Sequence, residues 1–348
     1  MRVGVFTGGG DAPGLNAAIC GLGRRLQAQG AELLGFRDGW RGLIEDDSRP
    51  LGTVDFQHLL VHGGTLLGSS SANPYRDPER DVPRVLDTMQ TNRLDAIVAI
   101  GGEGTLGAAD RLFTEHGLPV VGVPKTIDND LEATDFTFGF FSAVEVVTRA
   151  IDDLRSTAES HGRVMVVECM GRHAGWITAY AGVAAAAEVI LVPERPAQLA
   201  ELCENLERLR RAGARAAIVA AAEGCRVFDG ERCLSSLDRD EFGHYKTGGV
   251  ADLLAREIQT RIGWEARALV LGHLQRAGRP IAFDRIFALR LGAKAARLVL
   301  ERRFGTMAAL RAGEVVEVPL REALAQRKVL TDQFLDRYET FFLPISSP

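Results

Sequence analysis

The chain has 348 residues, which is long for one globular domain and comfortable for two. It contains 46% hydrophobic and 25% charged residues, as folded soluble proteins do, and its formal charge of −5 argues against a general nucleic-acid surface, which needs a basic field. The five cysteines form no C-x-x-C pair, which suits a reducing compartment, and no uncharged apolar run reaches membrane-spanning length. We therefore expect a cytoplasmic protein that binds neither nucleic acid nor a membrane.

Short apolar runs alternate with helical patterns along most of the chain. The first run, residues 3–6, predicts a buried strand, and Leu15, Ile19, Leu22 and Leu26 then recur at helical spacing. Further strands are expected at residues 33–36, 94–100, 120–123, 164–169, 189–192, 216–221, 268–271 and, half-exposed or at an edge, 315–318; further helices are expected at residues 106–115, 140–160, 174–187, 197–211 and 287–302. This alternation predicts a parallel β-sheet with helices on both faces.

A glycine-rich loop follows the first expected strand and runs from Gly8 to Asn16. Glycines between a strand and a helix allow a phosphate to approach backbone N–H groups, and the amino end of the helix adds a favourable field. The loop does not clearly match the dinucleotide fingerprint G-x-G-x-x-G, and the chain lacks the P-loop G-x-x-x-x-G-K-[ST]. It is therefore either a phosphate site of another kind or a plain turn.

Two acidic loops follow the third and fourth expected strands. Glu103, in the sequence GGEGT, would bind magnesium, although the same segment could simply cap the helix that Thr105 opens. In the sequence PKTIDND, Lys125 would attract phosphate, and either Asp128 or Asp130 would act as a base while the other braces the turn. The residues alone do not choose between the two aspartates. Two such loops at successive strand ends predict phosphoryl-transfer chemistry.

Two later loops combine arginine with histidine directly after an expected strand. They are MGRHAG, residues 170–175, and GHLQRAG, residues 272–278, and both would suit a sugar phosphate. Their histidines, taken singly, are more often structural than catalytic. Glu223 ends another strand, where its carboxylate would accept hydrogen bonds from sugar hydroxyls unless it belongs to a solvated turn.

Taken together, GGGDAPGLNA, GGEGT, PKTIDND, MGRHAG and GHLQRAG resemble the motifs of the phosphofructokinase family in order and approximate spacing, over roughly residues 1–305. The resemblance implies two Rossmann-like three-layer α/β/α domains with the active site in the cleft between them. Residues 1–138 and 256–305 would form the phosphoryl-donor domain, and residues 139–255 the sugar-phosphate domain. Residues 306–348 would add a C-terminal strand and helix.

The same resemblance implies transfer of a phosphoryl group to the 1-hydroxyl of fructose 6-phosphate, giving fructose 1,6-bisphosphate in glycolysis, with Mg²⁺ as cofactor. Asp128 matches the catalytic base, Arg172 a residue that steadies charge on the moving phosphoryl group, and Glu103 the metal-binding acid, commonly aspartate in the family. The matching donor-binding positions are Gly10, Gly102, Glu103, Gly104 and Thr105. The matching sugar-phosphate positions are Thr126, Ile127, Asp128, Met170, Gly171, Arg172, Glu223, His273, Leu274, Gln275 and Arg276.

Two further arginines carry an implication for assembly. Arg163 and Arg267 match family arginines that reach the sugar phosphate from a neighbouring subunit. The resemblance therefore implies a homodimer or homotetramer whose active site is completed across the subunit interface. Its small-molecule partners would be fructose 6-phosphate and either ATP or pyrophosphate.

Two positions inform the choice between ATP and pyrophosphate. Pyrophosphate-dependent members usually carry aspartate where this chain has Gly104, and that anion would occupy the space that the nucleotide's α-phosphate needs. Lys125 points the other way, because ordinary bacterial ATP enzymes have glycine there. The loop at residues 69–74 also lacks an arginine that ATP enzymes often carry. We give Gly104 more weight and expect an ATP-dependent enzyme, with the pyrophosphate-dependent reaction as the alternative.

Two more distant functions stay open. Lipid, sphingosine and NAD kinases carry a similar glycine-rich loop, but they lack the MGRHAG and GHLQRAG segments. A non-catalytic sugar-phosphate sensor on the same scaffold would not need Asp128, Glu103 and Arg172 together, although the presence of these residues does not prove turnover.

Overall fold

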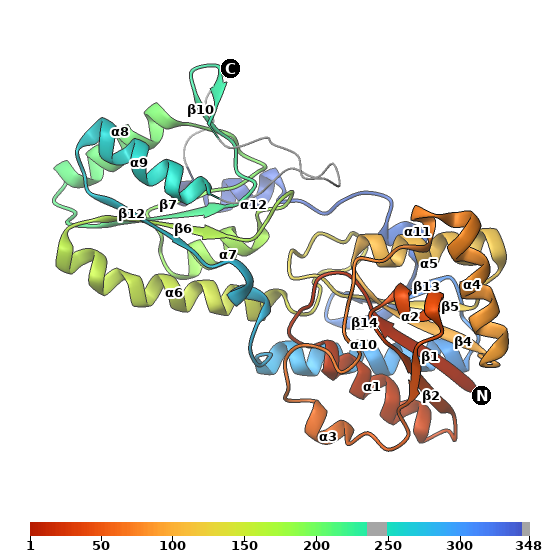
Figure 1. The fold of residues 1–348 in the computed structure, drawn as a ribbon. Coiled ribbons are helices and arrows are strands. Elements are labelled where there is room, and N and C mark those ends of the chain that lie inside the picture. The colour runs from red at the N-terminus through yellow and green to blue at the C-terminus, as the bar shows by residue number, and fades with distance from the viewer. Residues whose placement is uncertain (235–248, 343–348) are drawn as a thin grey trace. The chain divides into compact units, whose positions relative to one another are not determined.

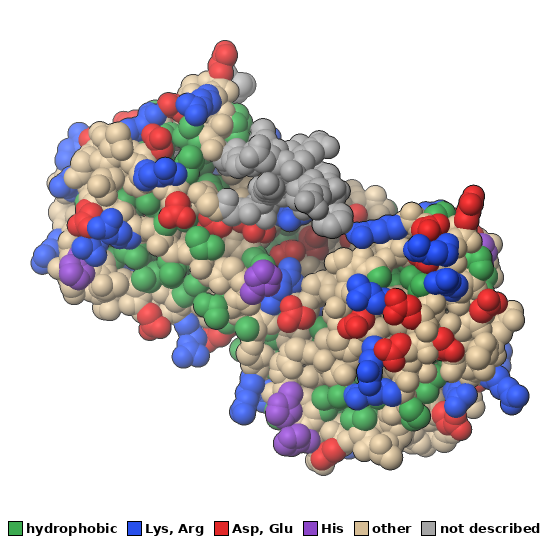
Figure 2. All heavy atoms as spheres, in the orientation of Figure 1, with side chains coloured by type: hydrophobic (Ala, Val, Ile, Leu, Met, Phe, Trp, Pro, Cys, Tyr) green, Lys and Arg blue, Asp and Glu red, His purple; other side chains and the backbone are tan. Residues whose placement is uncertain are grey.

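The computed structural model describes residues 1–234 and 249–342. The chain combines parallel β-sheets with helices, so the α/β class expected from the sequence is confirmed (Figure 1). Within the described residues, no helix has both the length and the apolar character to cross a membrane. Acidic and basic side chains are interspersed over the face shown in Figure 2, as the small net charge leads one to expect.

The chain folds into two compact units. The first comprises residues 1–142 and 276–328, and the second comprises residues 143–275 and 329–348. The chain thus passes from the first unit to the second and back, and then contributes its end to the second. Each unit has its own sheet and its own hydrophobic core.

The first unit contains a seven-stranded sheet in the order β14-β13-β5-β4-β1-β2-β3. The strands are β1 (Arg2–Thr7), β2 (Glu32–Phe36), β3 (Ser48–Pro50), β4 (Ala96–Gly101), β5 (Val120–Pro124), β13 (Thr306–Arg311) and β14 (Glu314–Pro319). The five inner strands are parallel, and the two edge strands β3 and β14 are antiparallel to their neighbours. β14 confirms the edge strand expected at residues 315–318.

Helices cover both faces of this sheet because its central strands are apolar on both sides. In β4, Val98 and Ile100 belong to the core that includes α1 and α10, whereas Ile97 and Ala99 belong to the core that includes α2, α4 and α5. The helices of this unit are α1 (Leu15–Gln27), α2 (Trp40–Glu45), α3 (Phe56–Leu59), α4 (Pro78–Thr91), α5 (Glu103–His116), α10 (Ala282–Leu300) and α11 (Leu320–Ala323), with the 3₁₀ turn η1 (Pro74–Arg76). A continuous apolar run is what a strand buried on both faces requires.

Two glycines allow α1 and α10 to cross at very short range. A Cβ atom at Gly292 would lie 2.0 Å from the carbonyl oxygen of Ala18, and one at Gly21 would lie 2.1 Å from that of Leu289. Both contacts are with backbone, which cannot move aside as a flexible side chain can. The crossing therefore fixes α10, far along the chain, against the helix that follows the first glycine loop.

The second unit is built on a four-stranded parallel sheet in the order β12-β6-β9-β7. Its strands are β6 (Val164–Cys169), β7 (Val189–Leu191), β9 (Ala217–Ala222) and β12 (Ala266–Val270), beside a small sheet of β8 (Ala197–Gln198), β10 (Val227–Asp229) and β11 (Arg232–Cys233). The remaining helices are α6 (Phe140–His161), whose first residues belong to the first unit, α7 (Trp176–Ala184), α8 (Leu199–Arg211), α9 (Val250–Ile262) and α12 (Asp332–Arg337), with the 3₁₀ turns η2 (Gly272–Arg276) and η3 (Glu339–Phe341). α9 packs against β6 and β12, and α7 against β7 and β9.

The units divide the chain at other residues than the sequence suggested. Residues 256–275, expected in the first domain, lie in the second unit because β12 pairs with β6, from Ala266 beside Val164 onward. Residues 306–328 lie in the first unit because β13 pairs with β5 and extends its sheet. In both cases strand pairing over a long sequence separation decides the membership.

Several elements differ from the pattern-based expectation. Neither α4 nor α9 was anticipated, and α4 contains Pro83 inside the helix, which normally counts against one. Burial of Val82, Val85 and Met89 on a single face outweighs that loss. The helix expected from residue 287 begins at Ala282, and residues 197–198 form β8 instead of the first turn of a helix.

Candidate active site

A pocket of about 290 Å³ lies in the first unit at the carboxyl ends of β1, β4 and β5. The carboxyl edge of a parallel sheet is where α/β folds bind ligands. Its lining is Gly9, Gly10, Ser71, Ala72, Asn73, Arg76, Gly102, Glu103, Gly104, Thr105, Lys125, Thr126, Asp128 and Arg276. The structure therefore brings together all five positions predicted to bind the donor, and it adds the wall at residues 71–76, which the sequence predictions did not assign to the site.

The first glycine loop is packed too tightly for side chains. A Cβ atom at Gly8 would lie 2.6 Å from Thr105 Oγ1, and Gly9 has a φ of +81°, a conformation that glycine adopts without strain. The N–H groups of Gly8 and Gly9 each donate to a backbone carbonyl at 2.9 Å. The phosphate contact predicted for this loop consequently falls to Gly10, which lines the pocket.

The second loop places a carboxylate at the amino end of a helix. α5 begins at Glu103, so the alternative in which Thr105 opens and caps this helix is wrong. Thr105 is instead buried against the first glycine loop. Glu103 is exposed, and its Oε2 atom pairs with Nη2 of Arg327 at 2.9 Å. A Cβ atom at Gly104 would meet no heavy atom within 4 Å, so this position faces open space in the pocket.

The loop after β5 separates the two aspartates that the residue pattern alone did not rank and of which the family resemblance favoured Asp128. Asp128 lines the pocket, and its N–H donates to Thr126 Oγ1 at 3.1 Å; Asp130 is not in the lining. Between them, Asn129 is fully buried with a φ of +52°, a left-handed conformation that asparagine tolerates better than most residues. The geometry thus favours Asp128 as the group facing a ligand. Ile127 is fully buried and is not part of the lining, so the structure does not present it to a ligand of the pocket.

Two cations donate hydrogen bonds to backbone carbonyls of the first glycine loop. The Nζ of Lys125, a residue that is only 3% exposed, donates to the carbonyl of Gly10, and Nη1 of Arg276 donates to the carbonyl of Asp11 at 2.9 Å. Burial lowers the pKa of Lys125 to about 8, helped by the charge of Arg276 and opposed by that of Asp128. Lys125 is therefore a buried brace of the loop as well as a source of positive potential.

A short segment near the end of the first unit contacts the loop after β5 and pairs with Glu103. Arg327 bridges to Leu131 as an antiparallel partner, and the N–H of Lys328 donates to the carbonyl of Asp130 at 3.0 Å. The Nζ of Lys328 donates to the carbonyl of Thr134 at 2.9 Å. The loop that carries Asp128 is thus pinned by residues about two hundred positions later in the sequence.

Sequence reasoning missed this segment. Residues beyond 305 carry no motif of the family, yet burial lowers the pKa of Lys328 to about 8, as it does for Lys125. One signal was available: the chain has only four lysines, Lys125, Lys246, Lys294 and Lys328. In so arginine-rich a chain, a lysine suggests a position where a compact ammonium is needed.

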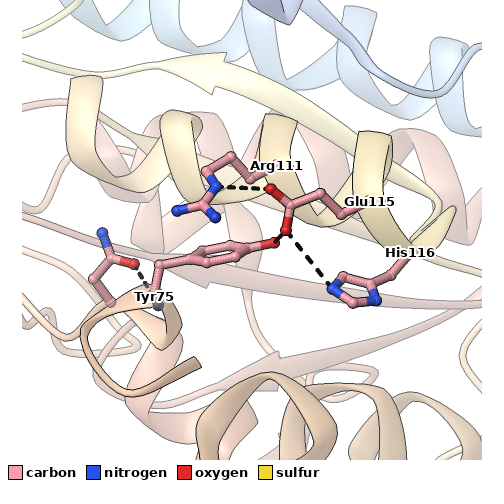
Figure 3. Close-up of polar contacts among 5 residues, drawn as sticks. Tyr75, Arg111, Glu115 and His116 are labelled. Atoms are coloured by element: carbon pink, nitrogen blue, oxygen red, sulfur yellow. Dashed lines mark hydrogen bonds and ion pairs between the residues drawn. The ribbon is translucent and has the colours of Figure 1, made fainter. Parts of the chain in front are cut away.

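A brace at the other end of α5 holds the pocket wall at residues 71–76 (Figure 3). Tyr75 Oη donates to Glu115 Oε2 at 3.0 Å, and Arg111 both pairs with Glu115 at 2.9 Å and stacks 3.6 Å above the Tyr75 ring. The carbonyl oxygen of the Asn73 side chain accepts from the N–H of Tyr75 at 2.9 Å. Because Arg76 follows directly, the brace positions the cationic part of this wall.

In the second unit, the residues predicted to bind the sugar phosphate gather at one edge of its sheet. They follow the carboxyl ends of β6, β9 and β12 and are Met170, Gly171, Arg172, Glu223, His273, Leu274 and Gln275. The side chain of Gln275 is fully buried and used internally, accepting from Met170 N–H at 3.0 Å and donating to the Gly272 carbonyl at 3.1 Å. It links two of the predicted loops, whereas Leu274 is exposed. Arg276, predicted with these residues, belongs to the first unit.

The two arginines predicted to serve a neighbouring subunit lie at the amino ends of the strands of this sheet, opposite the predicted ligand loops. Arg163 precedes β6 and Arg267 lies at the start of β12, and both pair with Glu265, at 3.0 and 2.8 Å. Strands of five or six residues separate them from the loops at Met170 and Gly272. At about 3.3 Å per residue, that distance exceeds the reach of an arginine side chain. These arginines cannot act on a ligand held at the carboxyl edge of their own sheet.

The carboxylates of the pocket can be tested against the magnesium ion that the sequence motifs imply. Among residues 1–234 and 249–342 there is no group of three or more histidine, cysteine or acidic residues that could hold a metal alone. Magnesium is commonly held by only one or two carboxylates together with substrate phosphates and water. Glu103, in the lining, supplies one such carboxylate, so the residues fit the ion.

Comparison with known proteins places these features in a family context. Residues 2–299 match the family model described as phosphofructokinase. The chain is 52% identical to a pyrophosphate–fructose 6-phosphate 1-phosphotransferase of Amycolatopsis methanolica, over 98% of this chain and 100% of that protein. It is 47% identical to ATP-dependent 6-phosphofructokinase 3 of Streptomyces coelicolor, over 95% and 97% of the two chains. Its fold resembles a pyrophosphate-dependent phosphofructokinase structure from Nitrosospira multiformis, with a TM-score of 0.84, 22% identity and coverage of 99% and 89%.

The buried ammonium of Lys125 predicts a pH dependence of stability. Its pKa is lowered from 10.5 to about 8 on folding, so the unfolded chain binds more protons between these values and the folded state gains stability as the pH rises. The free energy of unfolding of the wild type, minus that of Lys125→Met, should increase by about 2 kcal/mol between pH 7.5 and 9.5. Urea unfolding at both pH values measures this, with Lys294→Met as the control for loss of a lysine. A difference that stays constant would contradict the prediction.

Proposed function

Because the chain belongs to the phosphofructokinase family, we propose that it transfers a phosphoryl group from a donor to the 1-hydroxyl of fructose 6-phosphate. The observation that carries the proposal is the pocket of the first unit, which gathers Gly10, Glu103, Lys125 and Asp128 at the ends of neighbouring strands. The curated relatives above are named for this transfer with either pyrophosphate or ATP. The reaction would yield fructose 1,6-bisphosphate, as in glycolysis.

Each side chain of the pocket has a definable task in such a transfer. Phosphoryl transfer depends on alignment and charge neutralisation more than on covalent chemistry. Asp128, partly exposed in the lining, would accept the proton of the sugar hydroxyl. Glu103 would hold the magnesium ion, which when bound supplies charge neutralisation on the donor phosphates. Gly10 would offer its backbone to the donor, and Arg172 would steady the moving group.

For the donor we propose ATP, with pyrophosphate as the second candidate. Gly104 faces open space, so the volume that an aspartate would fill with an anion is available to the nucleotide's α-phosphate. Pyrophosphate is favoured by a specific observation too: Lys125 holds a positive charge beneath the glycine loop, and the Amycolatopsis methanolica relative is named for pyrophosphate. We give more weight to Gly104, because an aspartate there would exclude the nucleotide directly by its volume and charge. Lys125 counts for less, because it is buried and its ammonium is already bonded to a carbonyl.

For the sugar phosphate we propose a site shared between subunits of a homo-oligomer. Arg163 and Arg267 meet at Glu265, on the edge of their sheet that faces away from Met170 and Arg172. Two guanidinium groups converging on one carboxylate form a ready site for a phosphate, which can accept from both. Since these arginines cannot reach the ligand site of their own unit, they would contribute to the sugar-phosphate site of a second subunit.

The base is tested by Asp128→Asn. Loss of the carboxylate should lower kcat by about 10²–10⁴ with magnesium, fructose 6-phosphate and either donor, because a positioned base contributes that much. Asp130→Asn is the matched control, since Asp130 lies in the same loop but outside the pocket lining, and its kcat should stay within a few fold. Near-normal turnover of Asp128→Asn would remove the proposed role. A wild-type protein that forms product with neither donor would support a sugar-phosphate sensor instead.

The donor is tested by Gly104→Asp. The added Cβ meets nothing, and an acid in the first turn of α5 is favourable for the helix, so the protein should fold normally. We expect kcat/KM for ATP to fall at least tenfold more than kcat/KM for pyrophosphate. Gly104→Ala separates volume from charge and should change the ratio much less. An unchanged ratio in Gly104→Asp would refute the assignment of this position to donor choice.

The shared site is tested by complementation between subunits. Asp128→Asn and the double variant Arg163→Ala/Arg267→Ala should each be nearly inactive alone. Isolated mixed dimers should recover about half of the wild-type activity, because one of their two sites is intact, and the unseparated mixture about a quarter, because about half of its dimers are mixed. Co-expression with two affinity tags isolates them. Mixed oligomers without recovered activity would show that the arginines act within their own subunit or not at all.

A further inference from the structure

Arg327 pairs with a side chain that lines the pocket, and it comes from a part of the chain that carries no family motif. Its Nη2 lies 2.9 Å from Glu103 Oε2, and Glu103 lines the pocket. We propose that Arg327 is a donor-binding residue, which exchanges the carboxylate of Glu103 for a phosphate of the donor when the donor binds. This inference rests on the proposed function, because it takes the ligand of the pocket to be a phosphoryl donor.

The backbone beneath Arg327 is fixed, so only the side chain has to move. Arg327 bridges to Leu131, and the next N–H, that of Lys328, donates to Asp130 at 3.0 Å. Lys328 Nζ is bound by backbone carbonyls of the same loop, including that of Thr134 at 2.9 Å. A long side chain on an anchored backbone can change partners without disturbing the loop that carries Asp128.

The present partner of Arg327 is easily exchanged. The side chains of Arg327 and Glu103 are 37% and 59% exposed, and ion pairs of such exposure contribute little to stability. A phosphate offers the guanidinium two parallel charge-assisted hydrogen bonds and more negative charge than one carboxylate. Glu103 in turn is the group that would approach the donor-bound magnesium, which would release Arg327 as the donor arrives.

Two other cations near the pocket are already bonded to the first glycine loop. Lys125 and Arg276 donate to the carbonyls of Gly10 and Asp11, and moving them would unpin the glycine loop. The wall at residues 71–76 lines the pocket with Ser71, Ala72 and Asn73, which carry no charge, and with one cation, Arg76. Arg327 would act beside Arg76 and supply a donor arginine that the loop at residues 69–74 lacks.

Direct binding of pyrophosphate and of tripolyphosphate, without metal and in the presence of EDTA, tests the proposal by calorimetry. Arg327→Gln should weaken both at least tenfold, and Arg327→Lys less. Arg321→Gln is the matched control, because Arg321 is an exposed arginine on α11 in the same part of the chain, and it should bind as the wild type does. Affinities for Arg327→Gln equal to those of the wild type would overturn the proposal.

A double-mutant cycle separates contact with the donor from an effect through Glu103. Glu103→Gln should tighten metal-free binding, because it removes a repelling carboxylate and frees Arg327. Adding Arg327→Gln in that background should still cause a loss of at least tenfold. If the loss disappears there, Arg327 acts only by holding Glu103 and the proposed contact is wrong.

Turnover distinguishes failure of this inference from failure of the proposed function. If the wild type is active, Arg327→Gln should raise KM for the donor at least tenfold and leave KM for fructose 6-phosphate within about twofold. An unchanged donor KM would count against Arg327 alone. A wild type without transferase activity would refute the proposed function, and the metal-free binding measurements would still decide whether Arg327 binds phosphate.

Discussion

The burial of one ammonium group, that of Lys125, constrains the loops around the pocket of the first unit. Its hydrogen bond to the Gly10 carbonyl ties the loop after β1 to the loop after β5, across β4, which lies between them in the sheet. A buried charge is costly unless it is bonded, so the glycine loop must keep the conformation that presents this carbonyl. That conformation favours glycine at two positions. Gly9 has a positive φ, and a Cβ atom at Gly8 would lie 2.6 Å from Thr105 Oγ1.

The same principle operates a second time at Lys328. Its ammonium is surrounded by carbonyl oxygens of the loop after β5, and burial lowers its pKa as it does that of Lys125. The loop that carries Asp128 is thus held between two lysines, one preceding it and one about two hundred residues later. Such double anchoring holds the carboxylate of Asp128 in place before a ligand arrives, as the proposed phosphoryl transfer would require. The strands β13 and β14 extend the sheet beside β5, and the chain that follows them places residues 327 and 328 next to the loop after β5.

Several cationic side chains lie around the pocket, although the net charge of the chain is negative. Lys125, Arg276, Arg76 and Arg327 stand around or beneath it, against the carboxylates Glu103 and Asp128. In the second unit, the loops predicted to bind the sugar phosphate lie at the carboxyl ends of the strands. The Arg163–Glu265–Arg267 cluster lies at the amino ends. A parallel sheet makes this division unavoidable, because loops at its two edges cannot share one ligand.

Most strands, the glycine and acidic loops, and the likeness to one family could be inferred from local patterns. Apolar runs buried on both faces and loops at strand ends are properties of short segments, so residues near Gly10, Glu103 and Asp128 were found without coordinates. The membership of residues 256–275, the hidden helix α4, the choice of Asp128 over Asp130 as the residue lining the pocket, and the arrival of Arg327 could not. Each depends on pairing or burial between residues far apart in the chain, and such contacts leave no periodicity in the sequence that records them.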